Sequence, residues 1–189
     1  MSKMIIFTAP SGAGKTTIVR HLLKKFPQLA FSVSACTRSK RAHEVDGHDY
    51  YFISEDEFEQ KIKDKQFVEW EEFYHGLRYG TLHSEIDRLW ADGKHIIFDI
   101  EVKGATNIKN AYPEEAMVIF VKPPSIDELF KRLSNRNTED KDSLAARIAR
   151  AEEEFTYENS FDYVLLNDHL ETALLEAERV VDAFLNSSK

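Results

Sequence analysis

Four short, continuously apolar runs limit the possible folds of this chain more than any other feature of its sequence. They are rich in Ile, Val and Phe, and they occupy residues 4–8, 95–100, 116–121 and 162–166. Strands of a parallel sheet have this composition, because helices bury them on both faces. We therefore predict that the four runs form the centre of a parallel sheet.

Helical patterns separate these runs. The apolar side chains of residues 18–26 fall on one stripe, and so do those of residues 174–184. Ser54 and Ser125 each precede a glutamate by three residues, which is the spacing of a helix capping box. Alternating strands and helices predict an α/β fold with a doubly wound core, in which ligands bind at the carboxyl ends of the strands.

Two segments interrupt the alternation. Residues 33–83 are polar and aromatic, and alternating residues within them suggest antiparallel strands, so we predict an inserted β-rich module. Residues 125–150 predict a charged helical pair around a polar loop, as in a mobile lid over a site. The core would then comprise residues 1–32, 84–124 and 151–189.

Composition and charge narrow the class of protein. With 189 residues, 42% of them hydrophobic, the chain can bury a full core. Its net charge of -8 would repel a nucleic-acid backbone, so we expect no nucleic-acid partner. The single cysteine, Cys36, cannot form an internal disulfide, and the first apolar run is too short for a signal peptide or a membrane span. We expect a cytoplasmic location and no membrane partner.

The segment FTAPSGAGKTTIV, residues 7–19, follows the first apolar run and opens the first helical pattern. Its spacing is that of a phosphate-binding loop, Gly, four residues, Gly-Lys-Ser/Thr, with Ala9 in place of the first glycine. Main-chain N–H groups at such a bend converge on an anion, and the lysine adds a positive charge. An ordinary strand-to-helix turn is the alternative, but the position between a strand and a helix favours the phosphate site.

This loop also predicts a metal site. Thr16 would supply a hydroxyl to Mg²⁺, and Asp99, which ends an apolar run, would hold the same ion through water. An aspartate at a strand end can equally be structural. The residues predicted to contact the phosphates are Ala9, Pro10, Ser11, Gly12, Ala13, Gly14, Lys15, Thr16 and Thr17.

A second motif lies in the stretch SACTRSKRAHEVDGHDYYF. Its positions are Arg38, Arg41, Glu44, Gly47, Tyr50 and Phe52. They recur at the spacing of the guanylate kinase signature, and only Cys36 departs, standing where that family has a threonine. The segments APSGAGKTT, FVEWEEFYHGLRYGT, FDIEVKGA, RLSNRNT and FDYVLLND match the same family in order. The chain therefore resembles guanylate kinases over almost its whole length.

The resemblance implies Mg²⁺-dependent transfer of the γ-phosphoryl group of ATP to GMP or dGMP, giving ADP and GDP. Guanidinium forks match phosphate oxygens in a bidentate way, so Arg38 and Arg41 would hold the GMP phosphate. The hydroxyls of Tyr50 and Tyr79 would be neutral donors. Glu44 belongs to the same substrate-binding set through its place in the signature.

The base site follows from the same resemblance. Guanine presents two adjacent N–H donors, which a carboxylate could accept, and Glu69 would be that carboxylate, although taken alone an acid among other acids is more often at the surface. Ser34 and Thr81 would add hydroxyl contacts. The family usually shows Asp-x-Asp where this chain has Asp99 and Glu101, so both would face the acceptor, the second with one more methylene.

The predicted lid carries further arginines. The predicted catalytic residues are Lys15, Arg38, Arg132, Arg136 and Arg147. They would absorb charge on the transferred group. Arg150 could join them or pair with Glu154, and Asn137 replaces a glycine that is usual in the family. Asn167 matches a position near the donor adenine, and a turn-forming asparagine explains it equally well.

Two alternatives stay open at this point. One is a noncatalytic module that keeps the guanylate kinase fold for binding, against which the intact GAGKTT argues. The other is a related P-loop kinase with a different phosphorylated acceptor. We expect a monomer or a small homo-oligomer.

Overall fold

The computed structural model describes residues 2–72, 76–134 and 151–187. Its larger sheet has five strands in the order β2-β7-β1-β8-β9, and every neighbouring pair is parallel. The strands are β1 (Met4–Thr8), β2 (Leu29–Phe31), β7 (His95–Asp99), β8 (Ala116–Lys122) and β9 (Tyr163–Leu166). The predicted α/β fold and its central parallel sheet are therefore confirmed.

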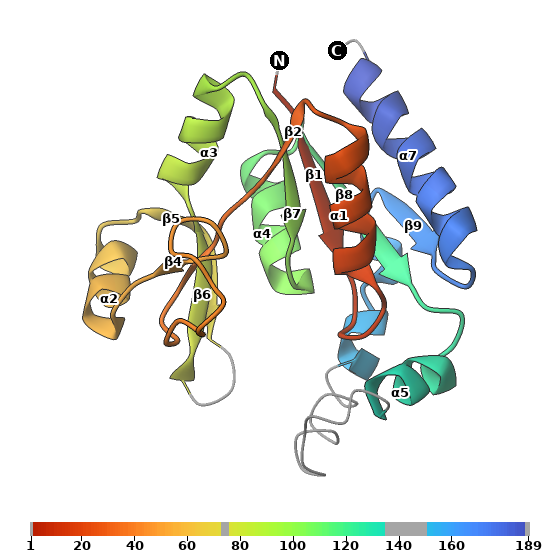
Figure 1. Cartoon of the computed structure of the whole chain (residues 1–189), viewed down its shortest axis with the longest axis horizontal. Coiled ribbons are helices and arrows are strands. Elements are labelled where there is room, and N and C mark those ends of the chain that lie inside the picture. The colour runs from red at the N-terminus through yellow and green to blue at the C-terminus, as the bar shows by residue number, and fades with distance from the viewer. Residues whose placement is uncertain (1, 73–75, 135–150, 188–189) are drawn as a thin grey trace.

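Helices cover both faces of this sheet (Figure 1). The helices α1 (Lys15–Lys25) and α7 (Leu170–Asn186) pack on one face, where Ile5 and Phe7 of β1 lie in their core. The helices α3 (His83–Ala91) and α4 (Val102–Ala111) pack on the other face, around Met4 and Ile6. Alternate side chains of one strand thus enter two separate cores, which explains why β1 is buried at every position and apolar at all but Thr8.

A second sheet, with the strand order β4-β3-β6-β5, forms the inserted module. Its elements are β3 (Ala35–Cys36), β4 (Tyr51–Phe52), α2 (Glu55–Lys63), β5 (Phe67–Glu72) and β6 (Arg78–Leu82). The pairs β5–β6 and β3–β6 are antiparallel, as predicted for this segment, but β3–β4 is parallel. Ser54 caps α2 by accepting a hydrogen bond from the Glu57 N–H. Phe58 is buried beneath this sheet, so the module has a small core of its own.

The module and α5 (Ile126–Ser134) extend from opposite sides of the larger sheet, near the carboxyl ends of its strands (Figure 1). The N–H of Glu128 donates to the Ser125 hydroxyl at 3.1 Å, as the predicted helix start requires. A short 3-10 helix (Glu158–Ser160) precedes β9. Among the described residues, no helix combines the length and the apolar character that a membrane span would need.

Candidate active site

The loop between β1 and α1 is a tight bend that needs glycine at two positions. Gly12 and Gly14 have φ values of +92° and +96°, which side-chain-bearing residues rarely adopt. A Cβ at Gly14 would lie 2.5 Å from the Nδ2 atom of Asn167. Ala13 is buried, and its N–H donates to the Pro10 carbonyl at 3.1 Å. The loop is thus closed on itself at the carboxyl end of the central strand.

Asn167 ties the far end of the chain to this loop. It follows β9, it is buried, and its Nδ2 donates to the Ala13 carbonyl at 2.7 Å. Its own N–H donates to the Lys122 carbonyl at the end of β8. Asn167 therefore links the phosphate loop to the end of β8. Its contact with an adenine ring stays a prediction.

Lys15, Thr16 and Asp99 meet at the start of α1. The Lys15 Nζ donates to the Ala9 carbonyl at 2.9 Å and lies 3.8 Å from Asp99 Oδ1. The Thr16 hydroxyl donates to Asp99 Oδ2 at 2.6 Å. The parallel register explains the meeting, because Phe7 of β1 is paired with Asp99 of β7. Of the other predicted loop residues, Pro10 is buried, Ser11 is half-buried and Thr17 is exposed.

These oxygens suit Mg²⁺. A hydroxyl and a carboxylate side by side are hard donors of the kind that Mg²⁺ prefers, and the ion usually takes its other ligands from water and substrate phosphates. In the part of the chain that the structure describes, no group of three His, Cys, Asp or Glu side chains could hold a metal ion. The residues therefore fit an ion held by few protein ligands together with a nucleotide.

In the module, Arg38 is fixed from two sides. Its guanidinium donates to both oxygens of Glu44, at 2.7 Å and 2.5 Å, and lies 4.9 Å from the centre of the Tyr50 ring. Glu44 also accepts from the Arg41 N–H at 2.8 Å. The Arg38 hydrogen bonds lower the pKa of Glu44 to about 2, so the pair stays charged. The ring centres of Tyr50 and Tyr79 lie 5.8 Å apart, edge to face, so that Arg38, Glu44 and the two tyrosines form one cluster, while Arg41 is exposed.

Glu69 lies on β5 between the module and the core. It is 8% exposed, and its Oε1 accepts a hydrogen bond from the Thr81 hydroxyl at 2.6 Å. A Cβ at Gly104 of α4 would lie 2.8 Å from Oε2. The absence of a side chain at Gly104 therefore leaves room for this carboxylate. Burial raises the pKa of Glu69 to about 7. The surface position that its acidic neighbours suggest is wrong, because β5 turns this side chain toward α4.

Three other predicted residues have known positions in the fold. Ser34 is half-buried, and its carbonyl accepts from the Tyr51 N–H at 2.9 Å. Glu101 is the N-terminal cap residue of α4, and its side chain is half-buried. Arg132 falls within α5. The remaining lid positions, Arg136, Asn137, Arg147 and Arg150, lie outside the described residues, and the roles of all these residues stay predictions.

Two features of the site are absent from the sequence predictions. Gly104 lies in the segment FDIEVKGA, which matches the family, but no role was predicted for it. Glu85 is buried on α3, and its carboxylate accepts hydrogen bonds from Val33 and Tyr51 of the inserted segment. A signal existed for it, because this acid stands on an apolar stripe with Leu82 and Leu89, where a charged residue needs partners.

The comparisons with known proteins agree with this arrangement. A family model described as "Guanylate kinase" matches residues 1–184. A guanylate kinase of Bacteroides fragilis is 45% identical over 184 residues, covering 97% of this chain and 90% of that protein. One of Salinibacter ruber is 45% identical over 184 residues, 97% of each. The crystal structure of guanylate kinase from Anaplasma phagocytophilum matches 99% of this chain and 88% of that one, with a TM-score of 0.76 and 23% identity, and so bears on the fold alone.

Proposed function

This chain belongs to the guanylate kinase family, and we propose that it transfers the γ-phosphoryl group of ATP to GMP or dGMP, giving ADP and GDP. The observation that carries the choice of acceptor is the buried carboxylate of Glu69, held by Thr81 at the edge of the module. Guanine offers two adjacent N–H donors to such a group. Adenine has no donor at its ring nitrogen, and a buried carboxylate left without partners is costly.

The two substrates would bind on either side of one reacting centre. The phosphate loop with Lys15 holds the tail of ATP, while the guanidinium groups of Arg38 and Arg41 hold the phosphate of GMP. Because Glu44 fixes the Arg38 fork in place, little side-chain freedom is lost when the phosphate arrives. An oxygen of the GMP phosphate attacks the γ-phosphorus, the bond to the β-phosphate oxygen breaks, and ADP leaves.

Charge neutralisation and alignment dominate this reaction, so no nucleophilic side chain is needed. Lys15 stabilises negative charge on the transferred group, and the lid arginines Arg132, Arg136 and Arg147 would add to this on closure. Thr16 and Asp99 would hold Mg²⁺, which when bound neutralises charge on the ATP phosphates. Closure over both substrates would exclude the water that could otherwise accept the phosphoryl group.

An acceptor screen tests the proposal. The protein is incubated with ATP and Mg²⁺ and with GMP, dGMP, AMP, UMP or CMP, and ADP release is measured. We expect turnover with GMP and dGMP and little with the other three. Turnover with another acceptor alone, or with none, would contradict the proposal.

A location in the cytoplasm and a monomer or small homo-oligomer complete the proposed description. The proposed location is based on one buried free thiol, Cys36.

Replacing the loop lysine tests the catalytic assignment. Lys15→Met should lower turnover by about a hundredfold or more, since it removes a charge that acts on the transferred group. Binding of GMP, measured by calorimetry without ATP, should be nearly unchanged because its site lies in the module. Wild-type turnover in this variant would refute the assignment.

A further inference from the structure

The chain passes between the core and the module at two places that lie close together. On the way out, residues 32–34 connect β2 to β3, and on the way back β6 runs directly into α3 at His83. The N–H of Ser32 still donates to the Ile97 carbonyl of the core, while the Ser34 carbonyl already accepts from Tyr51 of the module. A hinge between the two units has to involve these residues.

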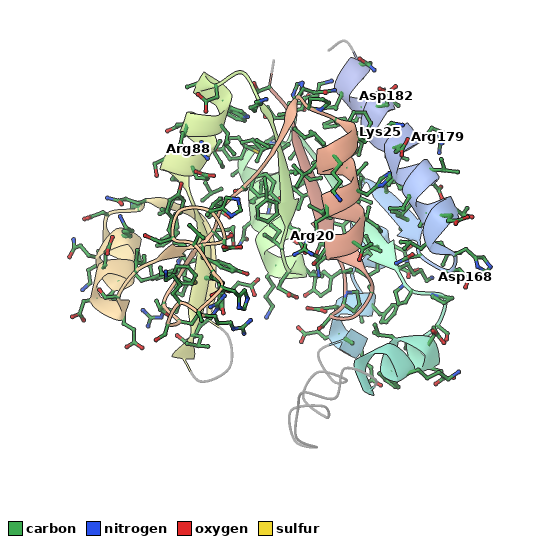
Figure 2. The ribbon with its side chains drawn as sticks, in the orientation of Figure 1. Arg20, Lys25, Arg88, Asp168, Arg179 and Asp182 are labelled. Carbon is green, nitrogen blue, oxygen red and sulfur yellow. The ribbon has the colours of Figure 1, made fainter. Side chains whose placement is uncertain are left out.

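The carboxylate of Glu85, in the first turns of α3, binds the segment that leads out to the module and also a strand of the module itself. Oε1 accepts from the Val33 N–H at 3.1 Å, and Oε2 accepts from the Tyr51 hydroxyl at 2.9 Å. The Arg88 guanidinium donates to each of the two oxygens at 2.9 Å. Figure 2 shows Arg88 on α3, on the side of the core where the module joins it.

Burial of the Glu85 carboxylate makes the loss of these hydrogen bonds costly in free energy. The Glu85 side chain is 1% exposed, whereas that of Arg88 is 50% exposed, so water reaches the cation but not the carboxylate. A buried carboxylate that loses a donor retains the cost of desolvation without the compensating bond. Val33 and Tyr51 are therefore held against Glu85 more firmly than surface hydrogen bonds would hold them.

The Tyr51 end of this network leads to the acceptor site. Tyr51 and Phe52 form β4, and Tyr50 directly precedes it. The rings of Tyr50 and Phe52 lie 4.9 Å and 5.3 Å from the Arg38 guanidinium. A shift of β4 relative to α3 would thus carry the proposed phosphate-binding arginine with it.

We propose that Glu85 is a positioning residue for the acceptor: through Tyr51 and Val33 it fixes the orientation of the module, and with it Arg38, relative to the phosphate loop. This inference rests on the proposed function, because it assigns the module to GMP. In this role Glu85 acts through its hydrogen bonds to Tyr51 and Val33. Loosening it enlarges the range of module orientations, so that GMP binding must restore order that the wild-type protein already has.

The Tyr51→Phe variant tests this with the smallest change. It removes one hydroxyl and keeps the ring, which packs against the small core around Phe58. We expect the KM for GMP, and its dissociation constant by calorimetry, to rise about tenfold, because binding must then order the module at a cost of about 1.4 kcal/mol. The KM for ATP should stay within about twofold, because the phosphate loop is untouched, whereas the melting temperature should fall somewhat, because the buried Glu85 carboxylate loses a donor.

Tyr163→Phe is the matched control. The Tyr163 hydroxyl also donates to a carboxylate, that of Glu176, but between β9 and α7, away from the module. We expect no change in the KM for GMP in this variant. Glu85→Gln should raise the KM for GMP at least as much as Tyr51→Phe, and the double variant should be no worse than Glu85→Gln alone, because both act through one contact.

The outcomes separate this inference from the function it rests on. If the wild-type protein does not phosphorylate GMP, the proposed function fails. If it does, but Tyr51→Phe leaves the affinity for GMP unchanged, the positioning role of Glu85 is overturned. It is also overturned if Tyr51→Phe raises the KM values for GMP and ATP by the same factor, since that pattern belongs to a purely structural contact.

Discussion

Replacing Glu69 by glutamine should stabilise the protein increasingly as the pH rises. Glu69 is 8% exposed, and burial raises its pKa from the ordinary value of 4.5 to about 7. The hydrogen bond from Thr81 lowers the pKa and the neighbouring Glu71 raises it, but both effects are smaller than that of burial. The folded protein therefore keeps a proton on this carboxyl at pH values where the unfolded chain has released it.

The size of the effect follows from the two pKa values. Because the folded-state pKa is the higher one, the stabilisation is complete below pH 4.5 and is lost as the pH rises through 7. The whole difference corresponds to about 3 kcal/mol of unfolding free energy. Glutamine keeps the shape but does not titrate. Urea unfolding should therefore show the Glu69→Gln variant gaining about 2 to 3 kcal/mol relative to the wild-type protein between about pH 5 and pH 8.

The same ionisation should appear in GMP binding. Only the carboxylate form of Glu69 can accept both guanine donors, and it makes up roughly a tenth of the molecules at pH 6 and roughly nine tenths at pH 8. The wild-type affinity for GMP should therefore be about tenfold weaker at pH 6 than at pH 8 from this cause. The phosphate of GMP also titrates near pH 6. Calorimetry on the Glu69→Gln variant measures that contribution by itself, and its subtraction leaves the part due to Glu69.

A difference between the wild-type protein and Glu69→Gln that does not change with pH would refute this reasoning. If the gap in unfolding free energy and the ratio of GMP affinities both stay the same from pH 5 to pH 8, Glu69 is ionised throughout. Its burial would then be compensated by more than the Thr81 hydroxyl.

Two glycine substitutions give further predictions. Gly14→Ala should lower the melting temperature and the affinity for ATP more than Gly93→Ala does. A Cβ at Gly14 would lie 2.5 Å from Asn167, whereas a Cβ at Gly93 meets no atom within 4 Å. Equal losses in the two variants would mean that the positive φ alone matters. Gly104→Ala should raise the KM for GMP about tenfold by displacing the Glu69 carboxylate, without a loss of stability, because alanine is favoured over glycine in a helix by about 1 kcal/mol. An unchanged KM would contradict the close approach.

The core of the fold could be predicted because strands that are buried on both faces carry apolar residues at consecutive positions. The exception is β2, which has only three residues, Leu29–Phe31, and no apolar run long enough to identify it. The parallel pair β3–β4 was also missed. Its two-residue strands are joined through the pairing of Ala35 with Tyr51, a contact that neither short segment predicts. The division into core, module and lid was read from composition and stays a prediction at its boundaries.

The site divides in the same way between local and distant contacts. The phosphate loop could be predicted because glycines and a lysine at fixed spacing describe one continuous bend. The base site could not be predicted from physical pattern alone, because Glu69 sits among acids and its burial depends on a helix that lies elsewhere in the chain. The family resemblance identified Glu69, since a motif records which residue occurs at a position. A motif does not record what that residue packs against, and Gly104 was therefore missed.

Glu85 shows how such distant contacts can be anticipated. Its position on the apolar stripe of α3 requires either exposure or buried donors, and α3 begins where the chain leaves the module. Donors must then come from the crossing segments, which are the parts of the chain that reach this helix. Val33 and Tyr51 supply them. An acid on the buried face of a helix beside a domain crossing is thus a physical signal that two units are held in a defined orientation, and it can be searched for without a family motif.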